Sequence, residues 1–291
     1  MKNKHRRAFV CVSHSPLMTI PTLADFGSEF RKNLAGTKSF IEEFSPDLVV
    51  MFAPDHLNLF EHIRPPFTSV ISATSLPEFS VPEFRFNIDV DLAARACEYL
   101  AKHDIDIAAA ERVQVDHGLT LTFTELFDNP ETVPLLPFVM NVIGFPVPPL
   151  RRALVFGAVV GKFLSSFEGS VLFVGTGGLS HNPPFPDPVP GEEKLTPAQR
   201  EISLATAPQW IDPKWDLELL SHISDGDAAW IQNLSQSEID KRGGGANEVR
   251  TWGSAWAACG YCAATFTAYE CVPEWITGMG IAAGVAWEHS D

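Results

Sequence analysis

Two short apolar runs decide the fold of this chain: Ala8-Phe9-Val10-Cys11-Val12 and Leu48-Val49-Val50-Met51-Phe52-Ala53. Both are rich in β-branched or aromatic side chains and have the length of buried strands. Between them, residues 28–44 have the pattern of a helix. A strand, a helix and a second strand predict a βαβ unit, in which parallel strands are joined by a right-handed crossover.

The same alternation continues along the chain. We expect helices at residues 91–103 and 151–167, and strands at 133–142 and 170–174. The sequence therefore predicts an α/β fold, with a mainly parallel central sheet flanked by helices. In such open sheets ligands bind at the C-terminal ends of the strands, so we expect the functional site there.

Residues 183–197 contain six prolines, too many for a helix or a central strand. We expect a long ordered loop in the region of about 182–213, acting as a lid or a subunit contact. No second complete α/β pattern follows this loop. The chain is therefore expected to be a single catalytic domain spanning residues 1–291.

The last organised stretch follows a run of three glycines. Asn247 is a reasonable N-cap, and apolar residues then recur at helical spacing from Trp252 to Phe266. Glu248 lies four residues before Trp252, on the same inward stripe. A carboxylate in that position needs a partner, because burying an unpaired charge is costly.

Composition excludes several classes of function. The net charge is −15, and the only basic cluster, at residues 2–7, has the character of a solvated tail, so a nucleic-acid partner is not expected. The apolar stretch after this tail is too short for a signal peptide, which predicts a cytoplasmic protein. Residues 251–269 carry no charge but are rich in Gly, Ser, Thr and Ala, and we expect a buried helix there rather than a membrane span.

The five cysteines do not suggest a disulfide framework. Cys259 and Cys262 have the Cys-x-x-Cys spacing, but no second pair follows, so we expect core thiols rather than a zinc or redox site. The glycines of residues 175–178 lack the spacing of a dinucleotide or Walker fingerprint. These glycines favour a sharp turn that places His181 at the end of the preceding strand.

Four histidines lie at the ends of apolar runs or beside turn residues: His14, His56, His117 and His181. A single histidine beside a turn is more often structural than catalytic. As a set, two strand-end histidines and one inward carboxylate satisfy the requirement of a non-haem Fe(II) centre, which keeps open coordination positions. Two further histidines would supply acid/base chemistry near neutral pH.

Six motifs then follow one another over nearly the whole chain: Ser13-His14-Ser15-Pro16, Phe52-Ala53-Pro54-Asp55-His56, Gln114-Val115-Asp116-His117-Gly118, Gly177-Gly178-Leu179-Ser180-His181 with Pro183-Pro184, Glu248-Val249-Arg250-Thr251-Trp252, and Pro273-Glu274-Trp275-Ile276. As an ordered set they resemble the class III extradiol catechol dioxygenases. The resemblance implies that Fe(II) is held by three ligands, namely His14, His56 and Glu248. It implies that His117 and His181 form an acid/base pair beside the iron. The resemblance leaves the order of the two open, and we assign His181 as the base and His117 as the acid. Asp116 would orient or tune His117, and Pro183 would shape the loop behind His181.

The implied reaction is cleavage of a catechol ring next to its two hydroxyls, using O2, in the catabolism of aromatic compounds. The resemblance suggests a 3-substituted catechol with a carboxyalkyl group, such as 3-(2,3-dihydroxyphenyl)propionate, and a homo-oligomer. The resemblance is weakest between the Pro-rich loop and Pro213, a segment that we expect to be shorter than in propionate-cleaving enzymes. The strongly acidic chain offers no evident cationic partner for a carboxylate, so a neutral or bulkier catechol stays an alternative.

Two other classes of function stay open. One is a non-enzymatic binding protein of the same superfamily with a degraded metal site, which the presence of all five site residues argues against. The other is a zinc hydrolase, because two histidines and a glutamate also suit catalytic zinc. Glu274 rivals Glu248 as the carboxylate ligand, although Pro273 and Trp275 beside it favour a packed turn.

Overall fold

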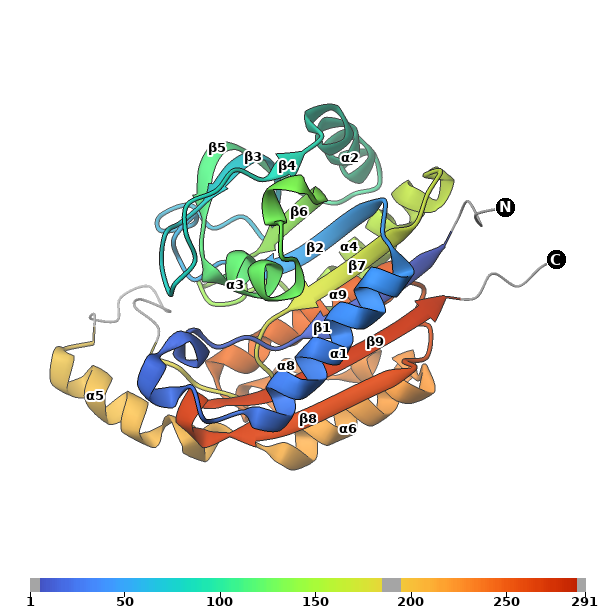
Figure 1. The fold of residues 1–291 in the computed structure, drawn as a ribbon. Coiled ribbons are helices and arrows are strands. Elements are labelled where there is room, and N and C mark those ends of the chain that lie inside the picture. Colours follow the sequence, from blue (N-terminus) through green and yellow to red (C-terminus); the bar gives the residue numbers. More distant parts are fainter. Residues whose placement is uncertain (1–5, 185–194, 287–291) are drawn as a thin grey trace.

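A computed structural model describes residues 6–184 and 195–286 of the chain, and in these residues one nine-stranded sheet lies between two layers of helices (Figure 1). The strands are β1 (Arg7–Val12), β2 (Leu48–Pro54), β3 (Phe67–Ser75), β4 (Asn87–Ile88), β5 (Ala108–Val115), β6 (Pro134–Met140), β7 (Val171–Thr176), β8 (Phe266–Val272) and β9 (Thr277–Ala286). The helices are α1 (Ser28–Phe44), α2 (Val90–Lys102), α3 (His117–Leu126), α4 (Leu150–Phe163), α5 (Pro197–Thr206), α6 (Pro213–Asp225), α7 (Ala228–Asn233), α8 (Gln236–Asp240) and α9 (Val249–Ala258). The expected α/β class is confirmed.

The strand order is β5-β3-β6-β2-β7-β1-β9-β8, with β4 paired to β6. The predicted βαβ unit is present, since β1 and β2 both run parallel to β7, which lies between them. Helix α1 begins and ends at the expected residues. Five of the strand pairs are parallel, while β1–β9, β8–β9 and β3–β6 are antiparallel. The carboxyl ends of β1, β2 and β7 therefore meet at one edge.

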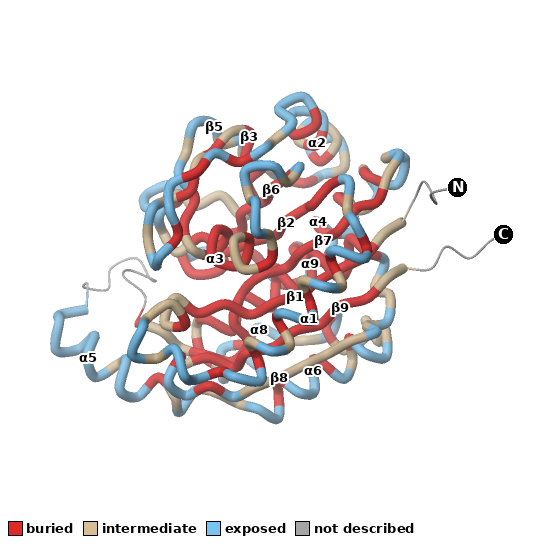
Figure 2. Tube along the Cα trace, viewed as in Figure 1, coloured by how far each residue is buried: buried red, intermediate tan, exposed pale blue. Residues whose placement is uncertain are grey.

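The central strands are buried on both faces, as Figure 2 shows for β1, β2 and β7. Along β1, alternate side chains join different cores, because successive residues of a strand point to opposite faces. Ala8, Val10 and Val12 pack in the core that includes Phe30 of α1. Phe9 and Cys11 pack in the other core, with Trp252 and Trp256 of α9. Burial on both faces explains why these strands are continuous apolar runs.

The helix expected to extend to Phe266 is much shorter. Helix α9 ends at Ala258, where Gly260 takes a positive φ of 72°. The Gly260 N–H donates to the Ala257 carbonyl at 3.0 Å and the Tyr261 N–H to the Trp256 carbonyl at 2.9 Å, a Schellman motif. Residues 266–272 instead form β8. The expectation for Asn247 was also wrong, since it lies inside a 3₁₀ turn, Gly244–Glu248.

Residues 185–194, the centre of the expected Pro-rich loop, lie outside the described residues, as do residues 2–5 of the basic tail. Beyond them, the loop expectation is wrong for residues 197–206, which form α5. Thr196 caps this helix through a capping box with Gln199. Pro197 occupies the first helical position, where proline is favourable because that N–H has no helical partner.

Within the described ranges, none of the helices combines the length and the apolar character that crossing a membrane requires. All five cysteines are free thiols. The sulfurs of Cys259 and Cys262 lie 3.6 Å apart just after α9. Cys259 is buried, as expected of a core thiol, whereas Cys262 is half-buried.

Candidate active site and metal centre

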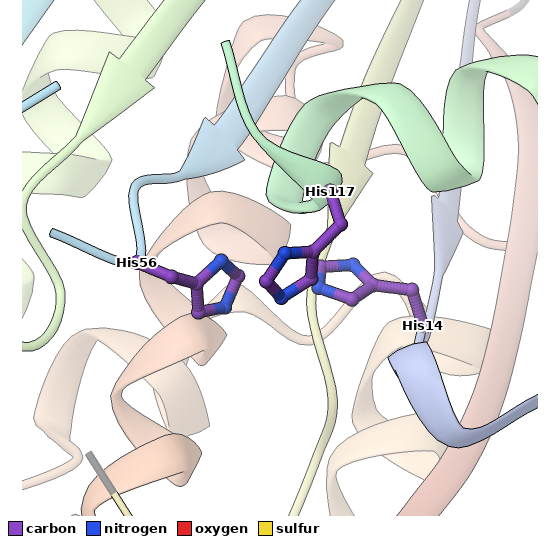
Figure 3. Close-up of side chains that lie close together, drawn as sticks. All are labelled: His14, His56 and His117. Atoms are coloured by element: carbon purple, nitrogen blue, oxygen red, sulfur yellow. The ribbon is translucent and has the colours of Figure 1, made fainter. Parts of the chain in front are cut away.

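The four sequence-predicted histidines come together at the carboxyl edge of the sheet. His14 and His56 each follow a strand, β1 and β2, by two residues, and His117 is the first residue of α3, just after β5. Figure 3 shows their rings turned toward one another from these three elements. One nitrogen from each ring lies within 4.8 Å of the others. His181, after β7, lines the same cavity.

Three of the rings have their Nδ1 atom held by a fixed partner. Nδ1 of His14 is hydrogen-bonded to Thr176 Oγ1 at 2.8 Å, and Nδ1 of His181 lies 2.9 Å from the Leu179 carbonyl. Nδ1 of His117 lies 2.8 Å from Glu78 Oε1. A carbonyl or carboxylate oxygen only accepts, so Nδ1 of His117 and of His181 carries the hydrogen. Their Nε2 atoms are then left with a free lone pair, the state that metal binding or proton transfer needs.

His56 is held by Asp116. The His56 backbone N–H donates to Asp116 Oδ2 at 2.8 Å, and Nδ1 of the ring lies 3.5 Å from the same oxygen. The other oxygen of Asp116 accepts from the Gly118 N–H and caps α3. Sequence analysis expected Asp116 to orient His117, yet the carboxylate hydrogen-bonded to the His117 ring is that of Glu78.

Glu248 is the inward carboxylate whose partner the sequence left unnamed. It ends the 3₁₀ turn before α9 and is 1% exposed. Its Oε1 lies 3.2 Å from His56 Nε2, and its Oε2 lies 3.8 Å from His181 Nε2 and accepts from the Gly178 N–H. Gly245 allows this approach, because a Cβ there would lie 2.2 Å from His181 Nε2.

Electrostatics give this group the charge pattern of a cation site. Burial opposes ionisation of Glu248, but His181, His56 and His14 outweigh it and lower the Glu248 pKa to about 2. Burial lowers the pKa of His14 to about 3, because its effect is larger than the opposite effect of the Glu248 charge. A carboxylate and a neutral imidazole therefore share a buried space. Such a donor set suits a divalent cation, since metal ligands must be deprotonated.

The histidines open into a cavity of about 380 Å³. Its other walls are mostly apolar and come from distant segments: Pro16, Leu17, Phe79, Pro183, Pro184, Leu204 and Ile276. Among its described lining residues Arg200, in the first turn of α5, is the single Lys or Arg side chain. A cavity with a polar buried end, an apolar wall and one cation fits a small aromatic acid.

Sequence reasoning missed Glu78 and Arg200. Arg200 lies inside α5, in the region expected to be a loop, and Glu78 follows β3 by three residues, a strand that the sequence analysis did not predict. Glu274, the rival carboxylate, is exposed on the short 3₁₀ turn Pro273–Trp275 and does not line the cavity.

Comparison with known proteins extends over nearly the whole chain. A family model described as the catalytic LigB subunit of aromatic ring-opening dioxygenase matches residues 8–280. Three similar proteins are each named as a 2,3-dihydroxyphenylpropionate/2,3-dihydroxicinnamic acid 1,2-dioxygenase. That of Xanthobacter autotrophicus is 32% identical, over 93% of this chain and 96% of the relative. That of Dechloromonas aromatica is 34% identical, over 93% of this chain and 96% of the relative. That of Rhodococcus jostii is 33% identical, over 96% of this chain and 98% of the relative.

Proposed function

This chain belongs to the family of catalytic LigB subunits of aromatic ring-opening dioxygenases, and we propose that it works with Fe(II) held by His14, His56 and Glu248. It is an extradiol dioxygenase, which opens a catechol ring beside the two hydroxyls with O2. The observation that carries the ligand proposal is the buried Glu248 carboxylate beside the His56 ring. Two imidazoles and one carboxylate leave open positions for a substrate and O2.

The proposed ligand set has one rival. His14, His56 and His117 also offer three nitrogens within 4.8 Å of one another. We favour Glu248 as the third ligand, because its carboxylate is ionised, is 1% exposed and lies 3.2 Å from His56 Nε2, and a divalent cation bound there would compensate its buried charge. His117 then stays free for proton transfer.

When bound, Fe(II) supplies the Lewis acidity that makes a catechol hydroxyl acidic and the redox chemistry that O2 requires. The chain's part is to move protons. We assign His181 as the base, since its Nδ1–H is fixed on the Leu179 carbonyl and Nε2 can take a hydroxyl proton. We assign His117 as the acid: its Nε2 first takes up a proton and then delivers it, while the hydrogen on Nδ1 stays hydrogen-bonded to the Glu78 carboxylate.

We propose that the substrate is a catechol with a carboxylate-bearing group at position 3. The names of the relatives support this class, since dihydroxyphenylpropionate and dihydroxycinnamate are both such acids. Arg200 on the cavity wall supports it independently. One Nη atom of Arg200 donates to the Pro184 carbonyl at 3.3 Å, which leaves other guanidinium donors for an anion.

We also propose a cytoplasmic homo-oligomer. Five free thiols support a reducing compartment. Ile202 of α5 and Leu217 of α6 are 63% and 51% exposed, and such apolar surface supports a subunit contact. Light scattering tests the assembly: a mass of 31.9 kDa, that of one chain, would contradict it.

Anaerobic metal analysis paired with O2 uptake tests the function. The expected result is one Fe(II) per chain and O2 consumption in step with a yellow ring-opened product from a catechol, with none from the matching monophenol, which cannot chelate the metal. Bound zinc without O2 uptake would favour a hydrolase. No bound metal and no turnover would favour a binding protein.

Single substitutions separate the two ligand sets. Glu248→Gln should lose iron, as should His14→Ala, whose residue belongs to both sets, whereas His117→Ala should keep it and lose roughly 10²-fold in rate, the usual size of general acid/base catalysis. His62→Ala is the control, because its side chain is 85% exposed on the surface. Loss of iron in His117→Ala would move His117 into the ligand set in place of Glu248.

A further inference from the structure

Glu78 makes two contacts with a single residue of the site. Its Oε1 accepts from the His117 backbone N–H at 2.8 Å and lies 2.8 Å from Nδ1 of the same residue. Its side chain is 25% exposed and that of His117 is 13% exposed, so the pair lies at the rim of the cavity and is partly shielded from water. No other carboxylate among the described residues is hydrogen-bonded to this ring.

The Glu78 carboxylate is presented by a strained turn. The Val81 N–H donates to the Glu78 carbonyl at 2.9 Å, which closes a four-residue turn. Both central residues have a positive φ, 47° at Phe79 and 66° at Ser80. This pattern is that of a type I′ turn, which strongly prefers Asn-Gly. A left-handed conformation is unfavourable for residues with a side chain such as Phe and Ser, and strain of this kind gathers at functional sites.

The residues on either side of this turn hold it against β5, the strand that ends just before His117. Ser75 is fully buried, and its Oγ donates to the Pro82 carbonyl at 2.7 Å and accepts from the Phe84 N–H at 2.8 Å. The Leu76 N–H donates to the carbonyl of Val115, two residues before His117, at 2.8 Å. The turn and His117 are therefore held as one unit.

Phe79, the next residue, completes the contact with the ring. Its side chain meets the His117 ring edge to face, with ring centroids 4.8 Å apart, and lines the cavity. His56 stacks on the ring at 4.1 Å. The His117 ring thus lies among Phe79, His56 and the Glu78 carboxylate, which sets both its plane and the side that carries the hydrogen.

We propose that Glu78 is the positioning residue of His117, an inference that rests on the proposed function. Its carboxylate keeps the hydrogen of His117 on Nδ1 and aims Nε2 at the reacting substrate. Glu78 does not touch substrate or metal, and acts through His117 alone. The strained turn Glu78–Val81 delivers this carboxylate to the ring.

Steady-state kinetics of the iron-loaded enzyme test the proposal. Glu78→Ala should lower kcat on the order of 10- to 100-fold, the usual effect of removing a partner that orients a functional histidine. KM should change less than about twofold and the iron content should stay at that of the unchanged enzyme, because Glu78 touches neither substrate nor metal. Glu78→Gln keeps an acceptor oxygen and should recover most of kcat.

A double substitution distinguishes positioning from helix capping, which Glu78 also performs through the His117 N–H. If Glu78 acts only through the His117 ring, adding Glu78→Ala to His117→Ala should cause no further loss of kcat. A purely structural role predicts that the two losses multiply and that Glu78→Gln restores stability without activity. Either result would overturn the proposal.

Two further measurements complete the design. Glu83→Ala is the matched control, since Glu83 lies exposed on the same hairpin and contacts Thr74 at 3.4 Å. NMR of ¹⁵N-histidine in protein loaded with diamagnetic zinc should show His117 protonated at Nδ1, and this signature should be lost in Glu78→Ala. An unchanged His117 tautomer would overturn the proposal. Absence of ring cleavage by the unchanged enzyme would instead overturn the proposed function.

Discussion

Arg200 is the residue on which the choice of substrate depends. Replacing it by Gln should lower kcat/KM for 3-(2,3-dihydroxyphenyl)propionate about tenfold or more, since a lost charge contact of ~1.4 kcal/mol is a factor of ten. Turnover of catechol and 3-methylcatechol should not change, because neither carries a carboxylate. Arg95→Gln, at an exposed site on α2, is the control. An equal loss for all three catechols would mean that Arg200 supports the cavity wall rather than the carboxylate.

Asp216 gives a pH dependence of stability. It is fully buried, and accepts from the Ser180 N–H, the Ser180 hydroxyl and the Tyr269 hydroxyl at 2.9, 2.7 and 2.7 Å. Burial raises its pKa from 3.8 to about 6, and the hydrogen bonds from Ser180 and Tyr269 offset this only in part. The folded state therefore holds the proton more tightly than the unfolded state does. Its contribution to stability must fall as pH rises from about 4 to about 6.

Asp216→Asn isolates this effect, because Asn does not titrate. The free energy of unfolding of the unchanged protein, minus that of the variant, should fall by up to ~3 kcal/mol between pH 4 and pH 6.5, at about 1.4 kcal/mol for each pKa unit. Urea unfolding at several pH values measures it. Two parallel stability curves would contradict the role given to burial of the carboxylate.

At the scale of elements, α4 packs closely against α9. A Cβ on Gly157 of α4 would lie 2.1 Å from the Ser254 carbonyl oxygen of α9, and backbone cannot move aside cheaply. Gly157→Ala should therefore destabilise the protein by about 1–3 kcal/mol through overpacking, although Ala is the better helix former.

Gly36 on α1 provides the matched comparison. It is exposed, and nothing lies within 4 Å of a Cβ built there. Gly36→Ala should stabilise the protein by up to ~1 kcal/mol, the difference in helix propensity. Urea unfolding of both variants checks the pair. Equal effects in the same direction would show that contact with α9 does not limit position 157.

The elements that the sequence predicted best are those whose apolar pattern follows directly from their burial. Helix α1 and strands β1, β2 and β7 are set by burial, so their apolar pattern marks them within one or two residues. Strand β5 was missed because most of its side chains are partly or fully exposed at the sheet edge. Helix α9 was overextended because the apolar spacing continues past Gly260, whose positive φ ends the helix.

In the candidate site, too, some residues are marked by a local sequence pattern and others are not. The histidines and Glu248 could be predicted because each lies near the end of an apolar run or beside turn residues in the sequence. Glu78 could not, since its partner lies 39 residues away and its turn contains Phe79 and Ser80 in place of the usual turn residues. Contacts between distant loops leave no local pattern.

At the scale of the whole molecule, the proposed metal ligands come from segments that are far apart in the sequence. His14, His56 and Glu248 come from the loops after β1 and β2 and from the turn before α9. An unfolded chain cannot hold them together, so a bound cation must stabilise the folded state. At 100 times its dissociation constant the gain is about 2.7 kcal/mol.

Thermal unfolding measures this gain without any turnover. Adding Fe(II) anaerobically, or zinc, should raise the Tm by several degrees, at roughly 2–4 °C for each kcal/mol in a chain somewhat smaller than this one. His14→Ala and Glu248→Gln should abolish the shift, because each removes a ligand. His117→Ala should keep it, since the free Nε2 of His117 serves proton transfer. A shift that survives in Glu248→Gln and vanishes in His117→Ala would instead place the metal among the three histidines.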